Sequence, residues 1–224
     1  MVKLTSTTID IPAGSTDYAV EDSYVLPVDV DLLSVYPHAH YLARDIRARA
    51  TLPTGDTRDL LTIADWNFHW QEFYRYREPV TLPRGTTVSM RVSYDNSAAH
   101  QHHPGDTPAR VVYGPRSSDE MADVWLQVLP RDPADLPRLA RDFVERRREA
   151  RIRSAEEAIR RAPASASGYN LLATEYLGAG RTAEAIDLLR EAVRRAPSSA
   201  EANNNLGAAL IRAGRAADAV RFLR

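Results

Sequence analysis

The pattern of apolar and polar positions changes near residue 130 of the 224-residue chain. Before that point, short alternating or β-branched runs are broken by Pro, Gly and Asp, which is typical of strands joined by turns. We predict strands over residues 5–11, 32–40, 45–52, 67–76, 86–94 and 123–129. Many short strands at this spacing favour an antiparallel β-sandwich, jelly-roll-like in kind.

Turn residues and one aromatic run refine this prediction. Residues 53–56 (Pro-Thr-Gly-Asp) and 83–85 (Pro-Arg-Gly) have the composition of hairpin turns. Over residues 66–71, aromatic side chains alternate with polar ones, as expected for a half-buried strand.

The pattern after Pro130 is Ala, Arg, Glu and Leu at helical spacing, with an internal period of 34 residues. Pro163, for example, maps onto Pro197. Small residues that recur where helices cross, with a closing proline, resemble tetratricopeptide repeats. We identify two repeats, residues 166–199 and 200–224, after a helical segment that ends at Pro163.

Together these patterns predict a multidomain β + α chain. Residues 1–130 form the β-sandwich, residues 131–163 a linker and leading helix, and residues 164–224 an α-helical tetratricopeptide-repeat solenoid. The last repeat stops inside its second helix without a polar capping helix, so we expect the natural array to continue or the chain to be a fragment.

Composition excludes several classes of partner and site. The formal net charge of −1 gives no sign of a nucleic acid or an anionic membrane as partner. The absence of cysteine excludes disulfides and thiolate metal sites. No apolar run approaches the length of a membrane-spanning helix, and the first residues lack the apolar stretch of a secretory signal.

Two short stretches carry candidate metal ligands. His38 and His40 lie two positions apart in a predicted strand, so their side chains point to the same face. Met121, near the last predicted strand, adds a thioether to the two imidazoles. This combination of ligands suits copper, particularly Cu(I), better than zinc, magnesium or calcium.

The residues around these candidate ligands give further support to a copper site. They read Tyr-Pro-His-Ala-His-Tyr-Leu at 36–42 and Gly-Pro-Arg-Ser-Ser-Asp-Glu-Met at 114–121. In this they resemble the C-terminal domain of the copper type II, ascorbate-dependent monooxygenases, of the peptidylglycine α-hydroxylating type. The resemblance covers most of residues 5–130, with the two motifs in the family's order and at a similar separation.

The resemblance implies a catalytic site made of His38, His40 and Met121. These residues would bind one copper ion per chain, at which O₂ binds and a substrate C–H bond is hydroxylated, with one coordination position left open. Asp119 and Glu120 are expected to position the site, because hard carboxylates suit Cu(I) poorly. The family also implies ascorbate or another one-electron donor and a periplasmic or extracytoplasmic location.

This sequence departs from the family in two ways. The preceding domain, whose histidines bind a second copper, has no counterpart in these 224 residues, so turnover is expected to require an upstream copper or electron-transfer domain. The peptide-hydroxylating member binds its substrate carboxylate with Arg, Asn and Tyr, where this chain has Tyr36, Asp123 and Trp125. This argues against peptidyl-glycine as the substrate.

A second histidine-rich stretch is interpreted differently. His100, His102 and His103 precede Pro104 and Gly105 in a polar loop. Because no predicted element orients these rings, we expect solvated side chains there and no metal site.

Three functions follow from these observations. The first is the copper-binding half of an O₂-dependent monooxygenase of unknown substrate, joined to repeats that bind a protein partner. The second is a non-catalytic interaction or scaffold protein that works through its repeats, with Asn170, Asn203 and Asn204 available to hydrogen-bond an extended peptide in the groove. The third is copper storage or delivery.

Overall fold

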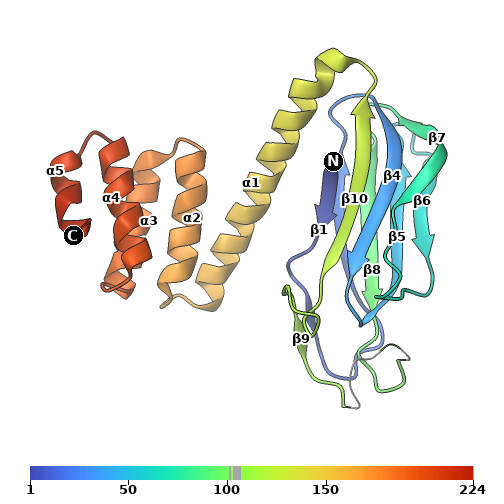
Figure 1. Cartoon of the computed structure of the whole chain (residues 1–224), viewed down its shortest axis with the longest axis horizontal. Coiled ribbons are helices and arrows are strands. Elements are labelled where there is room, and N and C mark those ends of the chain that lie inside the picture. The colour runs from blue at the N-terminus through green and yellow to red at the C-terminus, as the bar shows by residue number, and fades with distance from the viewer. Residues whose placement is uncertain (101, 103–106, 224) are drawn as a thin grey trace. The chain divides into compact units, whose positions relative to one another are not determined.

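The computed structural model describes residues 1–100, 102 and 107–223 (Figure 1). The chain divides into two compact units, Met1–Asp142 and Phe143–Arg224. The first unit holds the strands, and the second holds helix pairs. The division falls within helix α1 (Leu136–Arg161), which follows the short helix η1 (Pro133–Asp135).

The strands of the first unit form two four-stranded antiparallel sheets and one short pair. The first sheet has the order β1-β10-β4-β7, the second has the order β3-β8-β5-β6, and β2 pairs with β9. The strands are β1 (Val2–Thr5), β2 (Asp10–Ile11), β3 (Tyr18–Val25), β4 (Val30–Ala39), β5 (Ala43–Thr51), β6 (Thr57–Ile63), β7 (Tyr74–Leu82), β8 (Thr87–Tyr94), β9 (Val111–Val112) and β10 (Ala122–Pro130).

Each large sheet has one apolar face that is buried. In β8, the side chains of Val88, Met90 and Val92 are buried, while Arg91 between them is exposed. In β10, Val124 and Leu126 are fully buried. This alternation is expected for antiparallel sheets that bury one face and leave the other toward solvent.

The predicted strand over residues 67–76 is wrong for its first seven residues, because β7 begins only at Tyr74. Asn67 closes a turn instead: its side chain accepts from the backbone N–H of His69 at 2.9 Å, and its carbonyl accepts from that of Trp70 at 2.9 Å. Asparagine favours such local bonds over a strand ladder. The aromatic alternation in residues 66–71 therefore belongs to an irregular segment.

Other strand predictions also need correction. Residues 5–11 are not one strand, because β1 ends at Thr5 and β2 pairs with β9. Strands β3, β6 and β9 lie outside the predicted strands. The 53–56 turn joins the paired strands β5 and β6 as predicted. The 83–85 turn is no hairpin, however, because β7 and β8 belong to different sheets.

The second unit consists of helix hairpins repeated at the predicted interval. Helix α2 (Ala166–Gly178) is followed by α3 (Thr182–Arg195), α4 (Ala200–Arg212), α5 (Ala216–Ala219) and η2 (Val220–Phe222). Ser165 and Ser199, which stand 34 positions apart, cap the N-termini of α2 and α4 through their hydroxyls. Buried side chains of α2, α3 and α4 form a common apolar core that includes Ala173, Leu189 and Leu206.

In the part of the chain that the structure describes, no helix has the length and apolar character needed to cross a membrane.

Candidate functional site

His38 and His40 lie at the end of strand β4, beside the first residues of β10. Ala39 between them is fully buried, so both histidines belong to the opposite face of the strand. Their ring centroids are 5.2 Å apart, at an interplanar angle of 85°. Two imidazoles that bind one ion through nitrogens at about 2 Å have centroids roughly 5 Å apart, and an ordinary edge-to-face ring pair has the same separation.

The His38 ring is oriented by Gln71. Its Nδ1 atom lies 2.6 Å from Oε1 of Gln71, and Nε2 of Gln71 donates to the carbonyl of Phe68 at 2.7 Å. The second bond fixes the amide, so that its oxygen faces the imidazole. Because this oxygen only accepts, Nδ1 of His38 carries the proton, and the lone pair of the neutral ring lies on Nε2.

The His40 ring is held in the same tautomer. Its Nδ1 donates to the backbone carbonyl of Asp119 at 2.9 Å. The His40 carbonyl accepts from Nε1 of the buried Trp66 at 3.0 Å, and the Phe68 ring lies edge-on to the imidazole. Both histidines thus use Nδ1–H for orientation, so Nε2 is the ring nitrogen that a metal would use.

Met121 directly precedes β10, and His40 directly follows β4. The two residues therefore flank the last pair of the ladder, Ala39 and Ala122. Two hydrogen bonds anchor the Met121 backbone: its carbonyl accepts from the Tyr94 hydroxyl at 2.8 Å, and its N–H donates to Glu120 at 3.2 Å. The metal-ligand set itself stays a prediction.

Glu120 connects the two segments. Its buried carboxylate accepts the backbone N–H groups of His40 at 2.9 Å and Leu42 at 2.6 Å, in addition to that of Met121. Burial raises the pKa of Glu120 to about 7, although the three N–H donors act in the opposite direction. Burial also raises the pKa of Tyr94, and the nearby Glu120 carboxylate adds to that shift.

The positions that replace the family's carboxylate-binding residues are occupied by contacts within the sheet. Asp123 is buried and bonded to Lys3 at 2.8 Å and to the Thr5 hydroxyl at 2.6 Å. Lys3 also lies 4.7 Å from the centroid of Trp125. The remaining position, Tyr36, stacks on Phe73 with centroids 4.5 Å apart. These three side chains therefore make contacts within the fold.

Two residues of the 100–103 stretch are held more firmly than expected. Nε2 of His100 bonds to the carbonyl of Tyr41 at 3.0 Å, and Nε2 of His102 lies 3.7 Å from Asp65. Both imidazoles are half-buried, so the expectation of freely solvated rings is wrong for them. Gln101 and His103 lie outside the described residues.

Among residues 1–100, 102 and 107–223, no three His, Cys, Asp or Glu side chains gather in a possible metal site. The predicted copper ligands are two histidines and one methionine, which include only two side chains of these four types. The result therefore does not bear on this ligand set.

The asparagines proposed for the repeat groove mostly serve the fold. Asn170 is buried, donates to Glu201 at 2.6 Å and accepts from Asn205 at 3.0 Å. Asn203 donates to the carbonyl of Pro197 at 2.8 Å, in the loop before its own helix. These two side chains are therefore not available to a peptide, whereas Asn204 is exposed.

The comparisons with known proteins bear on the repeats. A family model described as tetratricopeptide repeat matches residues 170–224. No curated protein matches the chain. Among solved structures, the chain is similar to MamA 41-end from Desulfovibrio magneticus RS-1, at 22% identity and a TM-score of 0.33, over 38% of this chain and 49% of that one. The chain thus spans about half the length of that protein.

Proposed function

We propose that the chain is a protein-interaction module whose tetratricopeptide repeats bind a protein or peptide partner. The observation that carries this proposal is the family match over residues 170–224, on helices that repeat every 34 residues. Stacked helix pairs of this kind form extended surfaces that such proteins use for binding.

The first helix of each repeat has an exposed apolar side chain that suits this role. Leu171 in α2 is 54% exposed, and Ile211 in α4 is 52% exposed. Asn204, also in α4, adds an exposed amide. Exposed apolar side chains on repeat helices favour contact with apolar residues of a partner, and the amide suits its backbone.

Partner capture with single variants tests this proposal. The full chain is used as bait, the captured protein is identified by mass spectrometry, and its affinity is then measured with purified components. We expect Leu171→Asp and Ile211→Asp each to weaken binding at least tenfold. Val25→Asp is the matched control, because Val25 is equally exposed but lies in β3. Equal binding by all variants would contradict the proposal.

The paired imidazoles support a second candidate function, a copper site of monooxygenase type. Both rings have Nδ1–H engaged, which leaves Nε2 as the nitrogen for a metal, and Met121 and His40 flank the last pair of the β4–β10 ladder. Two imidazoles and a thioether fit Cu(I) by ligand softness. His38, His40 and Met121 would hold the ion, and copper bound there would supply O₂ activation for hydroxylation of a C–H bond.

Finer features of the fold and of the copper site are also proposals. We infer a jelly-roll-like sandwich from the two sheets and a solenoid from the helix pairs. Ascorbate or another one-electron donor, an upstream copper domain and a periplasmic or extracytoplasmic location follow from the family resemblance.

Copper titration tests the second candidate directly. We expect one equivalent of Cu(I) to bind the full chain, and His38→Ala to lower its affinity at least tenfold. X-ray absorption is expected to show a sulfur ligand that is absent in Met121→Leu. His69→Ala is the control, since His69 is an exposed histidine outside the pair. A sulfur signal that persists in Met121→Leu would contradict this ligand set.

A further inference from the structure

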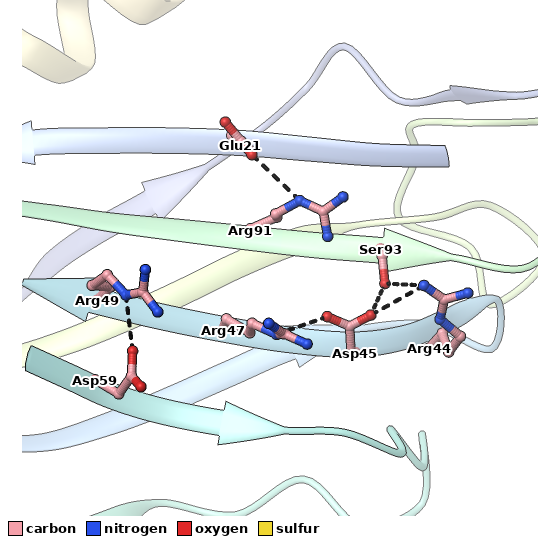
Figure 2. A network of polar contacts seen from close by, with 8 residues as sticks. All are labelled: Glu21, Arg44, Asp45, Arg47, Arg49, Asp59, Arg91 and Ser93. Carbon is pink, nitrogen blue, oxygen red and sulfur yellow. Dashed lines mark hydrogen bonds and ion pairs between the residues drawn. The ribbon is translucent and has the colours of Figure 1, made fainter. Parts of the chain in front are cut away.

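The outer face of the second sheet carries a groove of about 520 Å³ over strands β3, β8 and β5. Three arginines line it: Arg47 and Arg49 from β5, and Arg91 from β8. Figure 2 shows these side chains on the same face, with acidic residues beside them.

The register of β5 and β8 places the three arginines on neighbouring positions of this face. Arg47 is the direct cross-strand partner of Arg91, and Arg49 is the next outward-facing residue on β5. Like charges directly opposite each other destabilise a sheet. Any polar side chain would serve at an exposed position, so the fold itself does not require two facing cations. Glu21 and Asp45 offset part of this repulsion, and an anionic ligand between the two guanidinium groups would offset more of it.

Each of these arginines forms an ion pair with an acidic residue beside it. The ion pairs are Arg91–Glu21 (3.4 Å), Arg47–Asp45 (3.3 Å) and Arg49–Asp59 (2.9 Å). In each pair the arginine atom that approaches the carboxylate is Nε, as Figure 2 shows. A guanidinium has five N–H donors, so these contacts orient the side chains and leave donors for a ligand.

We propose that this groove binds a tetrahedral oxyanion, the phosphate group of a small molecule. Ser23 and Ser89, which are directly opposite each other, also line the groove, and the Ser89 hydroxyl donates to the carbonyl of Arg49 at 3.4 Å. Donors from three guanidinium groups on two strands suit an anion with oxygens in several directions better than a planar carboxylate. Asp22 also lines the groove, but its carboxylate accepts the backbone N–H of Thr5 at 2.8 Å. The site is independent of both functions proposed above.

Titration of the isotope-labelled full chain with inorganic phosphate, at fixed ionic strength, tests the proposal. The arginine Nε–H resonances are followed by NMR. We expect saturable shifts for the groove arginines and at least tenfold weaker affinity in Arg91→Gln. In Glu21→Gln we expect severalfold tighter binding, because a competing negative charge is removed. Arg58→Gln, on the neighbouring strand β6 outside the groove, is expected to bind as the unmodified chain does.

Other anions identify the ligand chemistry. A simple phosphate monoester is expected to bind at least as tightly as inorganic phosphate, and acetate at least tenfold more weakly. Absence of saturation with phosphate, equal loss in Arg91→Gln and Arg58→Gln, or equal affinity for acetate would overturn the proposal. Arg91→Gln is expected to fold, because it removes one member of a like-charged pair at an exposed position. A weaker affinity in this variant is therefore not explained by unfolding.

Discussion

A single buried carboxylate substitutes for backbone pairing where strands β4 and β10 part. Their ladder ends at the pair Ala39–Ala122. The Glu120 side chain then accepts the N–H groups of His40, Leu42 and Met121. Buried backbone donors must be paired, so this residue determines the path of both segments that carry the candidate ligands.

Glu120→Gln is expected to lower the free energy of unfolding of the first unit by about 1–3 kcal/mol, the usual effect of leaving a buried donor without an acceptor. The amide keeps one oxygen but presents N–H groups to backbone donors. Urea denaturation followed by tryptophan fluorescence measures the effect. Glu78→Gln, at an exposed position of β7, is the control; an equal change in both variants would count against the role given to Glu120.

Tyr76 predicts a pH dependence at the alkaline end. Burial raises its pKa to about 12, while its hydroxyl donates to the carbonyl of Leu60 at 2.6 Å. The folded state therefore keeps this proton where the unfolded chain, with a pKa near 10, has lost it. Stability is expected to fall as the pH rises from about 10 to about 12. Comparing unfolding free energies of the unmodified chain and Tyr76→Phe across this range isolates the effect, and identical pH profiles would refute it.

At the scale of elements, the 34-residue period sets where helices begin, but contacts between helices differ from one repeat to the next. Gly168 in α2 corresponds to Ala202 in α4. A Cβ atom at Gly168 would lie 2.8 Å from the Ile159 side chain and 3.0 Å from its backbone nitrogen. Helix α1 therefore approaches α2 too closely for alanine, whereas Ala202 is accommodated in the next repeat.

Gly168→Ala is expected to destabilise the helical unit by about 1 kcal/mol. Overpacking against a backbone atom costs about 1–3 kcal/mol, and the gain in helix propensity offsets up to ~1 kcal/mol of this. Gly178→Ala is the matched control, because no atom within 4 Å would meet its Cβ and only the propensity gain remains. Denaturation followed by far-ultraviolet circular dichroism gives both values. Stabilisation by both substitutions would show that the helices adjust without strain.

At the scale of the whole molecule, the unfolding of the two compact units can be followed by different spectroscopic probes. All three tryptophans, Trp66, Trp70 and Trp125, belong to the unit Met1–Asp142. Most helical residues belong to Phe143–Arg224. Units with separate cores unfold independently when little surface joins them.

We therefore expect tryptophan fluorescence and helical circular dichroism to give different urea midpoints. Glu120→Gln should shift only the fluorescence midpoint, and Gly168→Ala only the dichroism midpoint. These variants act as controls for each other. Coincident midpoints that move together in both variants would show one cooperative unit instead of two.

The sequence by itself determined the features that depend on local spacing. The repeat period and the 53–56 turn follow from residues close together in the chain. The caps at Ser165 and Ser199, which no sequence pattern predicted, are equally local. Alternation likewise indicated that β4, β5, β8 and β10 are strands. Helices, caps and tight turns form from neighbouring residues, so one chain segment contains most of the information.

Only the tertiary structure decided which distant groups meet. The 83–85 turn has hairpin composition, yet it leads from one sheet to the other. Neither the Glu120 contacts to His40 and Leu42 nor the pairing of Arg47 with Arg91 leaves a periodic signal in the sequence, because each joins segments more than 40 positions apart. Strand register depends on packing of whole sheets, so the groove and the ring orientations required the fold.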